Sequence, residues 1–505
     1  MIPAATLDVA AALPLILIAG GAFLVLALDL LLRGESDAEK YRKGSVLSFA
    51  SVGVLAAVIA AAASAFGVGA GAEFSPDHPM FQLDRLASFG IALVAVSTLL
   101  SILLSTYYLK EIGVQHGEYY ALVLLATGGM ILLVGAVDLV SVFLGIELMS
   151  IPIYVLAGFD RRKLRSNESA LKYFLAGSFA SAILLYGMAL VYGATGETSY
   201  AGIAAAEGGS APIGVLGIGL LLVGFTFKIS SVPFHQWTPD VYEGAPASVT
   251  AYMSVTVKAA AFVALVRLAA AAFAPVEGLI SDVLWVIAVA TMLVGNLMAV
   301  IQENVKRMLA YSSIAHAGYL LIGLIAVSPG NPTGYEAILF YLVAYLFLNL
   351  GAFGVLVSLA HRGHDAERFD EFAGLAKRRP ALAALMTLFM VGLAGMPGTA
   401  GFVAKFRIFM AAVQHDQLWL VVIAVFTTLV SVYYYLRLPV LMYMREPGEA
   451  AGRLRLSTGE LVALGTCAAA VIVLGILPNN GPGDALSWLR AFDWTRESVA
   501  ALAGR

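Results

Sequence analysis

The chain is dominated by long apolar segments separated by short polar or glycine- and proline-containing connections. A transmembrane helix needs about 20 mostly apolar residues to cross the hydrocarbon core of a bilayer. The pattern predicts fourteen helices, numbered as spans 1 to 14, at 11–32, 45–66, 86–109, 119–136, 138–157, 169–194, 213–235, 244–272, 279–300, 306–328, 334–361, 380–412, 416–443 and 457–478. The alternation typical of membrane β-barrel strands is absent from the sequence. We therefore predict an all-α polytopic membrane protein.

The distribution of basic residues among the connections tests the predicted number of fourteen spans. Most of the 30 Lys and Arg residues lie after odd-numbered spans, whereas only Arg85 and Arg267 follow or end the even-numbered ones within the chain. Cytoplasmic connections of membrane proteins carry an excess of Lys and Arg. The sequence therefore predicts that the odd-numbered connections are cytoplasmic and that both termini lie on the outer side. One missing or additional span would destroy this alternation.

The amino-acid composition excludes several classes of protein. Of the 505 residues, 60% are hydrophobic and 12% are charged, whereas soluble globular proteins carry about 25% charged residues. So few charges cannot cover a water-facing surface, which excludes an ordinary soluble enzyme, a nucleic-acid-binding protein and a disordered scaffold. The single cysteine, Cys467, cannot build a disulfide framework or a zinc or iron–sulfur site, and no GxGxxG motif opens a predicted helix. We predict no metal and no bound cofactor on this chain.

A few basic residues lie within the predicted spans rather than in the connections, namely Lys172, Lys228, Lys258, Lys405, Arg407 and Arg437. A charge at the bilayer centre costs about 2.5–3.5 kcal/mol on insertion scales. Lys228, Lys258 and Lys405 are the deepest, and Glu147 in span 5 is the clearest carboxylate at similar depth. A structural ion pair is the alternative explanation for each lysine. One obvious carboxylate leaves too little partner charge for three lysines, so we favour a function for them.

Two spans are interrupted by proline close to a deep lysine. Pro233 follows Lys228 in span 7, and Pro397 precedes Lys405 in span 12 within a glycine-rich stretch. Proline removes a helical hydrogen bond, and a broken helix at membrane depth is tolerated where it lines a cavity. Because the breaks lie five spans apart, we predict two five-helix repeats of inverted topology, spans 4–8 and 9–13. A packing kink is the alternative for either proline taken singly.

Polar side chains continue the row of deep charges. Ser254 lies one helical turn before Lys258 in span 8, and Ser312 lies one turn before His316 in span 10, next to Tyr311. Hydroxyl rows in membrane helices often serve only as interhelical hydrogen bonds. Because His316 falls between Lys258 and Lys405 in the order of spans, we favour a proton relay that includes it.

The same residues give the chain a family resemblance. Four segments, VPFHQWTPDVYEGAP (232–246), SVTVKAAAF (254–262), ENVKRMLAYSSIAHAGYLL (303–321) and GMPGTAGFVAKF (395–406), resemble the antiporter-like membrane subunit N of bacterial proton-pumping NADH-quinone oxidoreductase, respiratory complex I. The resemblance covers roughly spans 4 to 13. Sister subunits L and M and cation/proton antiporter subunits share the lysine pattern, but Lys405 and the PDVYEGAP string favour subunit N.

The resemblance implies a role for each matching residue. The proton-transfer residues would be, in order along the chain, Glu147, Lys228, Lys258, His316 and Lys405. Glu147 and Lys228 would form an ion pair in a first half-channel, Lys258 would be the central carrier, and Lys405 would belong to a second half-channel. The supporting polar axis would comprise His235, Tyr311, Glu168, Lys172, Ser254 and Ser312, with helix breaks at Pro233 and Pro397.

The resemblance also implies the setting. The protein would be a multi-pass subunit of the bacterial inner (plasma) membrane, in contact with lipids and with neighbouring antiporter-like and small membrane subunits of complex I, and without a nucleic-acid partner. NADH, flavin, iron–sulfur clusters and quinone would be bound by other subunits, where quinone reduction would drive proton transport. Two alternatives stay open: a subunit of a cation/proton antiporter without a redox link, and a structural membrane subunit.

The expected organisation has four parts. Residues 1–112 hold the three N-terminal helices, and residues 117–272 form the first antiporter-like repeat. Residues 279–443 form the second repeat, and residues 457–505 hold span 14 and a C-terminal segment, 484–505, predicted to lie at the outer membrane surface.

Overall fold

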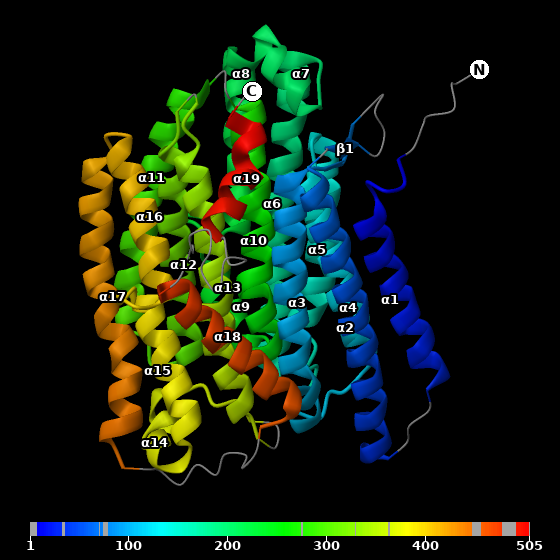
Figure 1. Cartoon of the computed structure of the whole chain (residues 1–505), viewed down its shortest axis with the longest axis vertical. Coiled ribbons are helices and arrows are strands. Elements are labelled where there is room, and N and C mark those ends of the chain that lie inside the picture. Colours follow the sequence, from blue (N-terminus) through cyan, green and yellow to red (C-terminus); the bar gives the residue numbers. More distant parts are fainter. Residues whose placement is uncertain are drawn as a thin grey trace, which may run out of the picture.

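The computed structural model describes residues 8–32, 36–69, 71–73, 79–273, 276–328, 330–361, 364–446, 456–476 and 491–503. The helices run roughly along the long axis of the molecule, with α1 at one edge and α17 at the other (Figure 1). The described elements are α1 (Leu13–Leu31), α2 (Asp37–Val68), β1 (Ala72–Glu73), β2 (Gln82–Leu83), α3 (Arg85–Glu111), α4 (Glu118–Gly135), α5 (Leu139–Ala157), α6 (Leu164–Thr195), α7 (Tyr200–Ala205), η1 (Glu207–Ser210), α8 (Pro212–Lys228), α9 (Trp237–Gly244), α10 (Ala247–Ala272), α11 (Glu277–Val300), α12 (Val305–Ile325), α13 (Thr333–Leu359), η3 (Phe369–Phe372), α14 (Leu375–Arg378), α15 (Pro380–Ala394), α16 (Ala400–Gln414), α17 (Leu418–Met444), α18 (Thr458–Ile476) and α19 (Ala491–Ala503).

Among the described residues, twelve helices are long and apolar enough to cross a membrane. They coincide with twelve of the predicted spans, and the chain is a multi-pass membrane protein. Two of them begin earlier than their apolar runs. Ser36 and Glu39 form a capping box that starts α2 at Asp37, and α6 starts at Leu164. Polar first turns therefore extend these helices beyond the segment that hydropathy alone identifies.

The other two predicted spans, 213–235 and 380–412, are interrupted. Here the chain forms the shorter apolar helices α8 and α15, and resumes as α9 and α16 after each break. Gly395 and Gly398 both have a φ of 85°, which side chains with a Cβ rarely adopt, so the glycines around Pro397 permit this turn. The first break passes Ser230, whose φ is 64°, before it reaches Pro233.

The least exposed helices are α10 and α12. Every residue of α12 except Arg307 is buried, and so is nearly all of α10. α12 packs against α11, α13 and α9, while α10 packs against α3, α4 and α13. A helix screened in this way can carry polar side chains, because they face protein rather than lipid.

The described part of the C-terminal segment forms α19, which packs against α13 and α3 (Figure 1). Phe492 of α19 lies with its ring centre 5.0 Å from that of Phe340 and 4.0 Å from the guanidinium of Arg407. The rest of the predicted surface segment, 484–490 and 504–505, lies outside the described residues.

One face of α10 is fastened to α3 and α4 by buried polar pairs. Thr256 is 2.8 Å from Ser97, and Tyr252 is 2.9 Å from Thr127. Further along, the Arg267 guanidinium donates two hydrogen bonds, of 2.7 and 2.6 Å, to the Asp84 carboxylate, which also caps the N-terminus of α3. This fastened face is distinct from the one that carries Ser254 and Lys258.

We expect Arg267→Met to destabilise the protein by about 3–5 kcal/mol, because it leaves the Asp84 carboxylate without its charged partner. The midpoint of thermal unfolding of the purified membrane complex measures the effect. The double variant Arg267→Met/Asp84→Asn, which removes both charges, should regain part of the loss. A single variant as stable as the parent would contradict this account of the pair.

Candidate functional site

The first break in the helices positions Lys228. This lysine is the last residue of α8 and is 2% exposed, and its Nζ donates a 2.6 Å hydrogen bond to Ser150 of α5. Its Nζ also lies 5.7 Å from the ring centre of Tyr154, one turn further along α5. An ammonium buried among aromatic rings and one hydroxyl is held by few compensating groups, which suits a site that gains and loses a proton.

Glu147 lies on α5, one turn before Ser150. It is partly buried and accepts a hydrogen bond from Ser181 of α6. Glu147 and Lys228 make no ion pair within 4 Å among the described residues; Lys228 instead contacts Ser150, close to the carboxylate. The two charges interact at a distance, so a small shift of α5 or α8 would change their interaction energy.

The second buried amine, Lys258, lies near the middle of α10. It is 2% exposed, and its Nζ donates a 2.6 Å hydrogen bond to the carbonyl oxygen of Ser313 on α12. One turn earlier, Ser254 accepts a 2.8 Å hydrogen bond from the Asn349 side chain of α13. Three helices therefore meet around Lys258.

His316 on α12 lies between two tyrosine hydroxyls. Its Nδ1 is 2.5 Å from the hydroxyl of Tyr341, and its Nε2 is 3.0 Å from that of Tyr435. The Tyr435 hydroxyl also forms a hydrogen bond with Ser312. A neutral imidazole accepts a hydrogen bond at one nitrogen and donates from the other, so His316 can link α13 to α17 through the two tyrosine hydroxyls.

The polar contacts continue from this point toward the second break. Tyr434, next to Tyr435, donates a 3.0 Å hydrogen bond to Asn296, and the Asn296 side chain donates one of 3.2 Å to Tyr319. The Nζ of Lys405 lies 5.0 Å from the ring centre of Tyr319. The row of contacts thus leads from the neighbourhood of His316 to Lys405.

Lys405 is buried in α16, and the second break supplies its partners. Its Nζ donates hydrogen bonds of 3.1 Å to the carbonyl oxygens of both Leu393 and Ala394. These carbonyls belong to the last turn of α15, where the helix leaves them without helical partners and presents its negative end. The interruption of the helix therefore creates the site that holds the buried ammonium.

Several predicted residues lie away from this row. Lys172 is 45% exposed and pairs with Glu168 at 2.8 Å and with Asp240 at 2.7 Å. Tyr311 is buried and has no side-chain hydrogen bond among the described residues. His235 is partly exposed, and its buried Nδ1 has no partner there either. Pro233 and Pro397 are exposed.

Sequence reasoning missed the tyrosines that connect the predicted residues, Tyr341, Tyr345, Tyr434 and Tyr435, together with Asn296. A signal was present: Tyr341 and Tyr345 lie one turn apart in one span, and Tyr434 and Tyr435 are adjacent in another. Tyr345 donates a 2.8 Å hydrogen bond to Ser313, the residue whose carbonyl accepts from Lys258.

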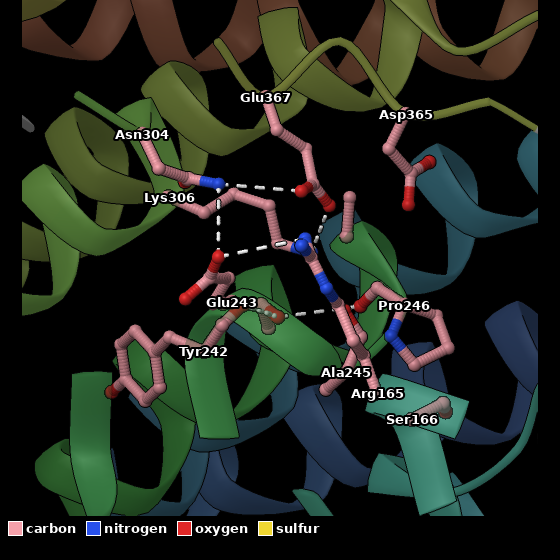
Figure 2. Close-up of polar contacts among 12 residues, drawn as sticks. Arg165, Ser166, Tyr242, Glu243, Ala245, Pro246, Asn304, Lys306, Asp365 and Glu367 are labelled. Atoms are coloured by element: carbon pink, nitrogen blue, oxygen red, sulfur yellow. Dashed lines mark hydrogen bonds and ion pairs between the residues drawn. The ribbon is translucent and has the colours of Figure 1, made fainter. Parts of the chain in front are cut away.

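A charged cluster lies at one end of α12, beside a cavity of about 210 Å³ (Figure 2). Lys306, 1% exposed, donates hydrogen bonds to the carbonyl oxygen of Ala245 at 2.7 Å and to Glu367 at 3.1 Å. Arg307 pairs with Asp240 at 2.7 Å and with Glu243 at 2.8 Å. These bonds fasten the junction of α9 and α10 to α12 and to the connection that follows α13.

Glu367 lies in that connection, outside the spans. Burial by itself raises the pKa of Glu367, but the Lys306 ammonium and the hydrogen bonds from Lys306 and Asn304 outweigh it and hold the pKa below its ordinary value. A carboxyl with a lowered pKa contributes stability at pH values above its unfolded pKa of about 4.3, and this contribution is lost as the pH falls through the folded pKa.

We therefore expect Glu367→Gln to loosen the connection around η3 by about 2 kcal/mol at neutral pH. Hydrogen–deuterium exchange of the segment 364–373 should be faster in the variant, and the difference should shrink once the pH falls below about 4. A difference that is equally large in acid would contradict the proposed charge pair.

Comparison with known proteins places this arrangement in a family. The family model described as "NADH:quinone oxidoreductase/Mrp antiporter, TM" matches residues 136–431. The chain is 45% identical over 441 residues to NADH-quinone oxidoreductase subunit N of Trichlorobacter lovleyi, covering 86% of this chain and 89% of that one. It is 43% identical to subunit N 1 of Sorangium cellulosum over 493 residues, covering 94% and 97% of the two chains. The chain belongs to the subunit N family of NADH-quinone oxidoreductases.

A solved structure supports this placement in the subunit N family. A chain of respiratory complex I from Thermus thermophilus with bound aureothin superposes with a TM-score of 0.77 at 33% identity, covering 95% of this chain and 99% of that chain. The resemblance inferred from the four segments is thereby confirmed. Among the described residues, no group of three or more His, Cys, Asp or Glu side chains is placed to hold a metal ion.

Proposed function

We propose that this chain translocates protons as subunit N of an NADH-quinone oxidoreductase, through Lys228, Lys258, His316 and Lys405. The observation that best supports the proposal is the row of buried polar contacts that leads from Lys258 past His316 to Lys405. Polar side chains within apolar helices cost free energy, and a row of neighbouring buried polar groups between two amines has the chemistry of a proton path.

In this mechanism each buried amine holds a proton in turn. Lys228 takes up a proton when the Glu147 charge is near and releases it when that charge is more distant. Lys258 receives it, and His316 passes it between the hydroxyls of Tyr341 and Tyr435 by accepting at one ring nitrogen and donating from the other. Lys405, held at the end of α15, is the last amine of the row.

Transport against a membrane potential needs an external source of free energy, because each charge costs about 2.3 kcal/mol per 100 mV. We assign this source to quinone reduction in other subunits of the complex. This chain then contributes no redox cofactor, and NADH, flavin, iron–sulfur clusters and quinone bind elsewhere. Its neighbours would be antiporter-like and small membrane subunits in the bacterial inner membrane.

The proposal extends to the architecture. The α8–α9 and α15–α16 segments would supply two further crossings, giving fourteen, and residues 117–272 and 279–443 would be inverted repeats, with 1–112 and 457–505 flanking them. Each break has a buried lysine beside it, Lys228 at the end of α8 before the first break and Lys405 in α16 after the second, and this recurrence supports the repeats. With basic residues concentrated after odd-numbered spans, both termini would lie on the outer side.

The proposal predicts that Tyr435→Phe lowers NADH-driven proton uptake by about tenfold, because the variant removes the hydroxyl shared by His316 and Ser312 but keeps the ring. Vesicles containing the assembled complex and a pH-sensitive dye measure the uptake. Tyr443→Phe on the same helix is the matched control, since Tyr443 is 49% exposed.

Normal pumping in Tyr435→Phe would contradict the relay. Proton-uptake measurements in the same vesicles also distinguish the two alternative functions. A cation/proton antiporter would respond to an imposed sodium gradient without NADH, and a structural subunit would lose assembly rather than proton transfer.

A further inference from the structure

A groove with a volume of about 1080 Å³ lies between α1, α4, α5 and α6. Its inner part is apolar and is lined by Leu26, Leu122, Leu125, Val155, Leu171 and Phe174. Its outer part is polar and lies at the connections α3–α4 and α5–α6, where His116, Glu118 and Arg161 line it. The groove is therefore amphiphilic along the direction of the helices.

A second cavity, of about 450 Å³, adjoins the polar end of the groove. The two cavities share Gly113, His116 and Glu118 as lining residues. Lys40, Lys43 and Lys110 line the second cavity from α2 and α3. Basic side chains thus approach residues 113–118 from both sides.

The place where the two cavities meet, at residues 113–118, is called the junction below. Ion pairs compensate only part of the positive charge around it. Lys43 pairs with Asp29 at 2.9 Å, and Arg162 pairs with Asp160 at 2.9 Å. The remaining lining cations, Lys40, Lys110 and Arg161, have no carboxylate within 4 Å in the part of the chain that the structure describes, and Glu118 is the remaining lining carboxylate. A surplus of positive charge faces the polar end.

Lys110 is also held in place. Its Nζ lies 4.5 Å from the ring centre of Tyr41 and 5.2 Å from that of Tyr107. Two aromatic faces restrain the side chain without neutralising it, so its ammonium is positioned for an anion.

We propose that this junction binds an anionic phospholipid from the leaflet on the side of the odd-numbered connections. The phosphate would lie between Lys110 and Arg161, with Lys40 nearby, and an acyl chain would lie in the apolar groove along α4, α5 and α6. Basic pockets between transmembrane helices recognise anionic headgroups, and only an amphiphile uses both the charged and the apolar part. The groove reaches Tyr154, whose ring centre also lies 5.7 Å from the Nζ of Lys228, but the cations proposed to hold the phosphate take no part in the proposed proton path.

Photo-crosslinking tests the site in the purified complex. A phosphatidylglycerol with a photoreactive acyl chain is incorporated into vesicles with the complex, and the labelled peptides of this chain are identified by mass spectrometry. We expect adducts within 114–125 and 154–174, competed by unlabelled phosphatidylglycerol but not by phosphatidylcholine.

Two variants and one control sharpen the test. Lys110→Gln/Arg161→Gln should lower labelling of these segments at least about fivefold, the effect of losing roughly 1 kcal/mol of phosphate contact. Leu122→Trp should lower it by filling the groove while the charges remain. Arg368→Gln, an exposed arginine paired with Asp370, should leave labelling unchanged.

Three results would overturn the proposal: equal competition by phosphatidylcholine, unchanged labelling in both variants, or lipid adducts on a neighbouring subunit with none in these segments. The first would make the site a general lipid contact. The last would make it a subunit interface.

Discussion

Replacing Lys258 with methionine is expected to abolish proton translocation by the assembled complex, with a loss of about a hundredfold or more. Methionine keeps a flexible chain of similar length in a site that is 2% exposed, but it can neither carry a proton nor donate to the Ser313 carbonyl. NADH-driven proton uptake in vesicles, measured together with quinone reduction, gives the ratio of protons moved to electrons transferred.

The matched control lies two residues earlier on the same helix. Thr256→Val removes a hydroxyl that bonds to Ser97 on the fastened face of α10 and leaves the Lys258 face intact. We expect the control to lower stability slightly and to keep pumping. Pumping that survives Lys258→Met in a normally assembled complex would remove Lys258 from the mechanism.

A loss of similar size is expected for Lys228→Met. This variant removes the amine that contacts Ser150 and responds to the Glu147 charge at the first break. If Glu147 acts by modulating Lys228, Glu147→Gln should reduce pumping less than Lys228→Met, and the double variant should be no worse than Lys228→Met alone. The readout is again proton uptake per electron.

Thr226→Val provides the control for α8. Within the described part of the chain, the Thr226 hydroxyl bonds only to carbonyls of its own helix, those of Leu222 and Val223, so its removal leaves the lysine in place. Additive losses in the Glu147→Gln/Lys228→Met double variant would indicate two independent functions. A complex that fails to assemble on native gels in Lys228→Met but not in the control would point to a structural lysine.

Much of the fold could be predicted because the membrane imposes a length and a composition on each helix. The apolar runs located twelve spanning helices to within a few residues at most ends, and the prolines located both interruptions. The apolar pattern placed the start of α2 too late, since its first turn is set by the Ser36 cap rather than by hydrophobic residues. The apolar pattern located α12 as a span but did not reveal that nearly all of its residues are buried within the protein.

The charged residues of the candidate site could be predicted from the sequence, whereas its neutral residues could not. Lys228, Lys258 and Lys405 stood out because a buried ammonium needs an explanation. The connecting residues are neutral: a tyrosine in a membrane helix has several ordinary roles, and only the structure shows that Tyr435 reaches His316 across 119 positions of sequence. The local sequence pattern also gave no indication of the ion pair between Arg267 and Asp84, which are 183 positions apart.

The near-complete burial of α12 has a consequence for biogenesis. A helix that enters the bilayer during synthesis meets lipid before its eventual neighbours are complete, and α12 carries Ser312, Ser313 and His316 near its middle. It is also the least apolar of the twelve candidate spans. α11 immediately precedes it and packs along its length. Co-insertion of α11 and α12 as a hairpin would shield these polar groups from lipid until α13 and α17 arrive, so the order of synthesis would protect residues of the proposed proton path.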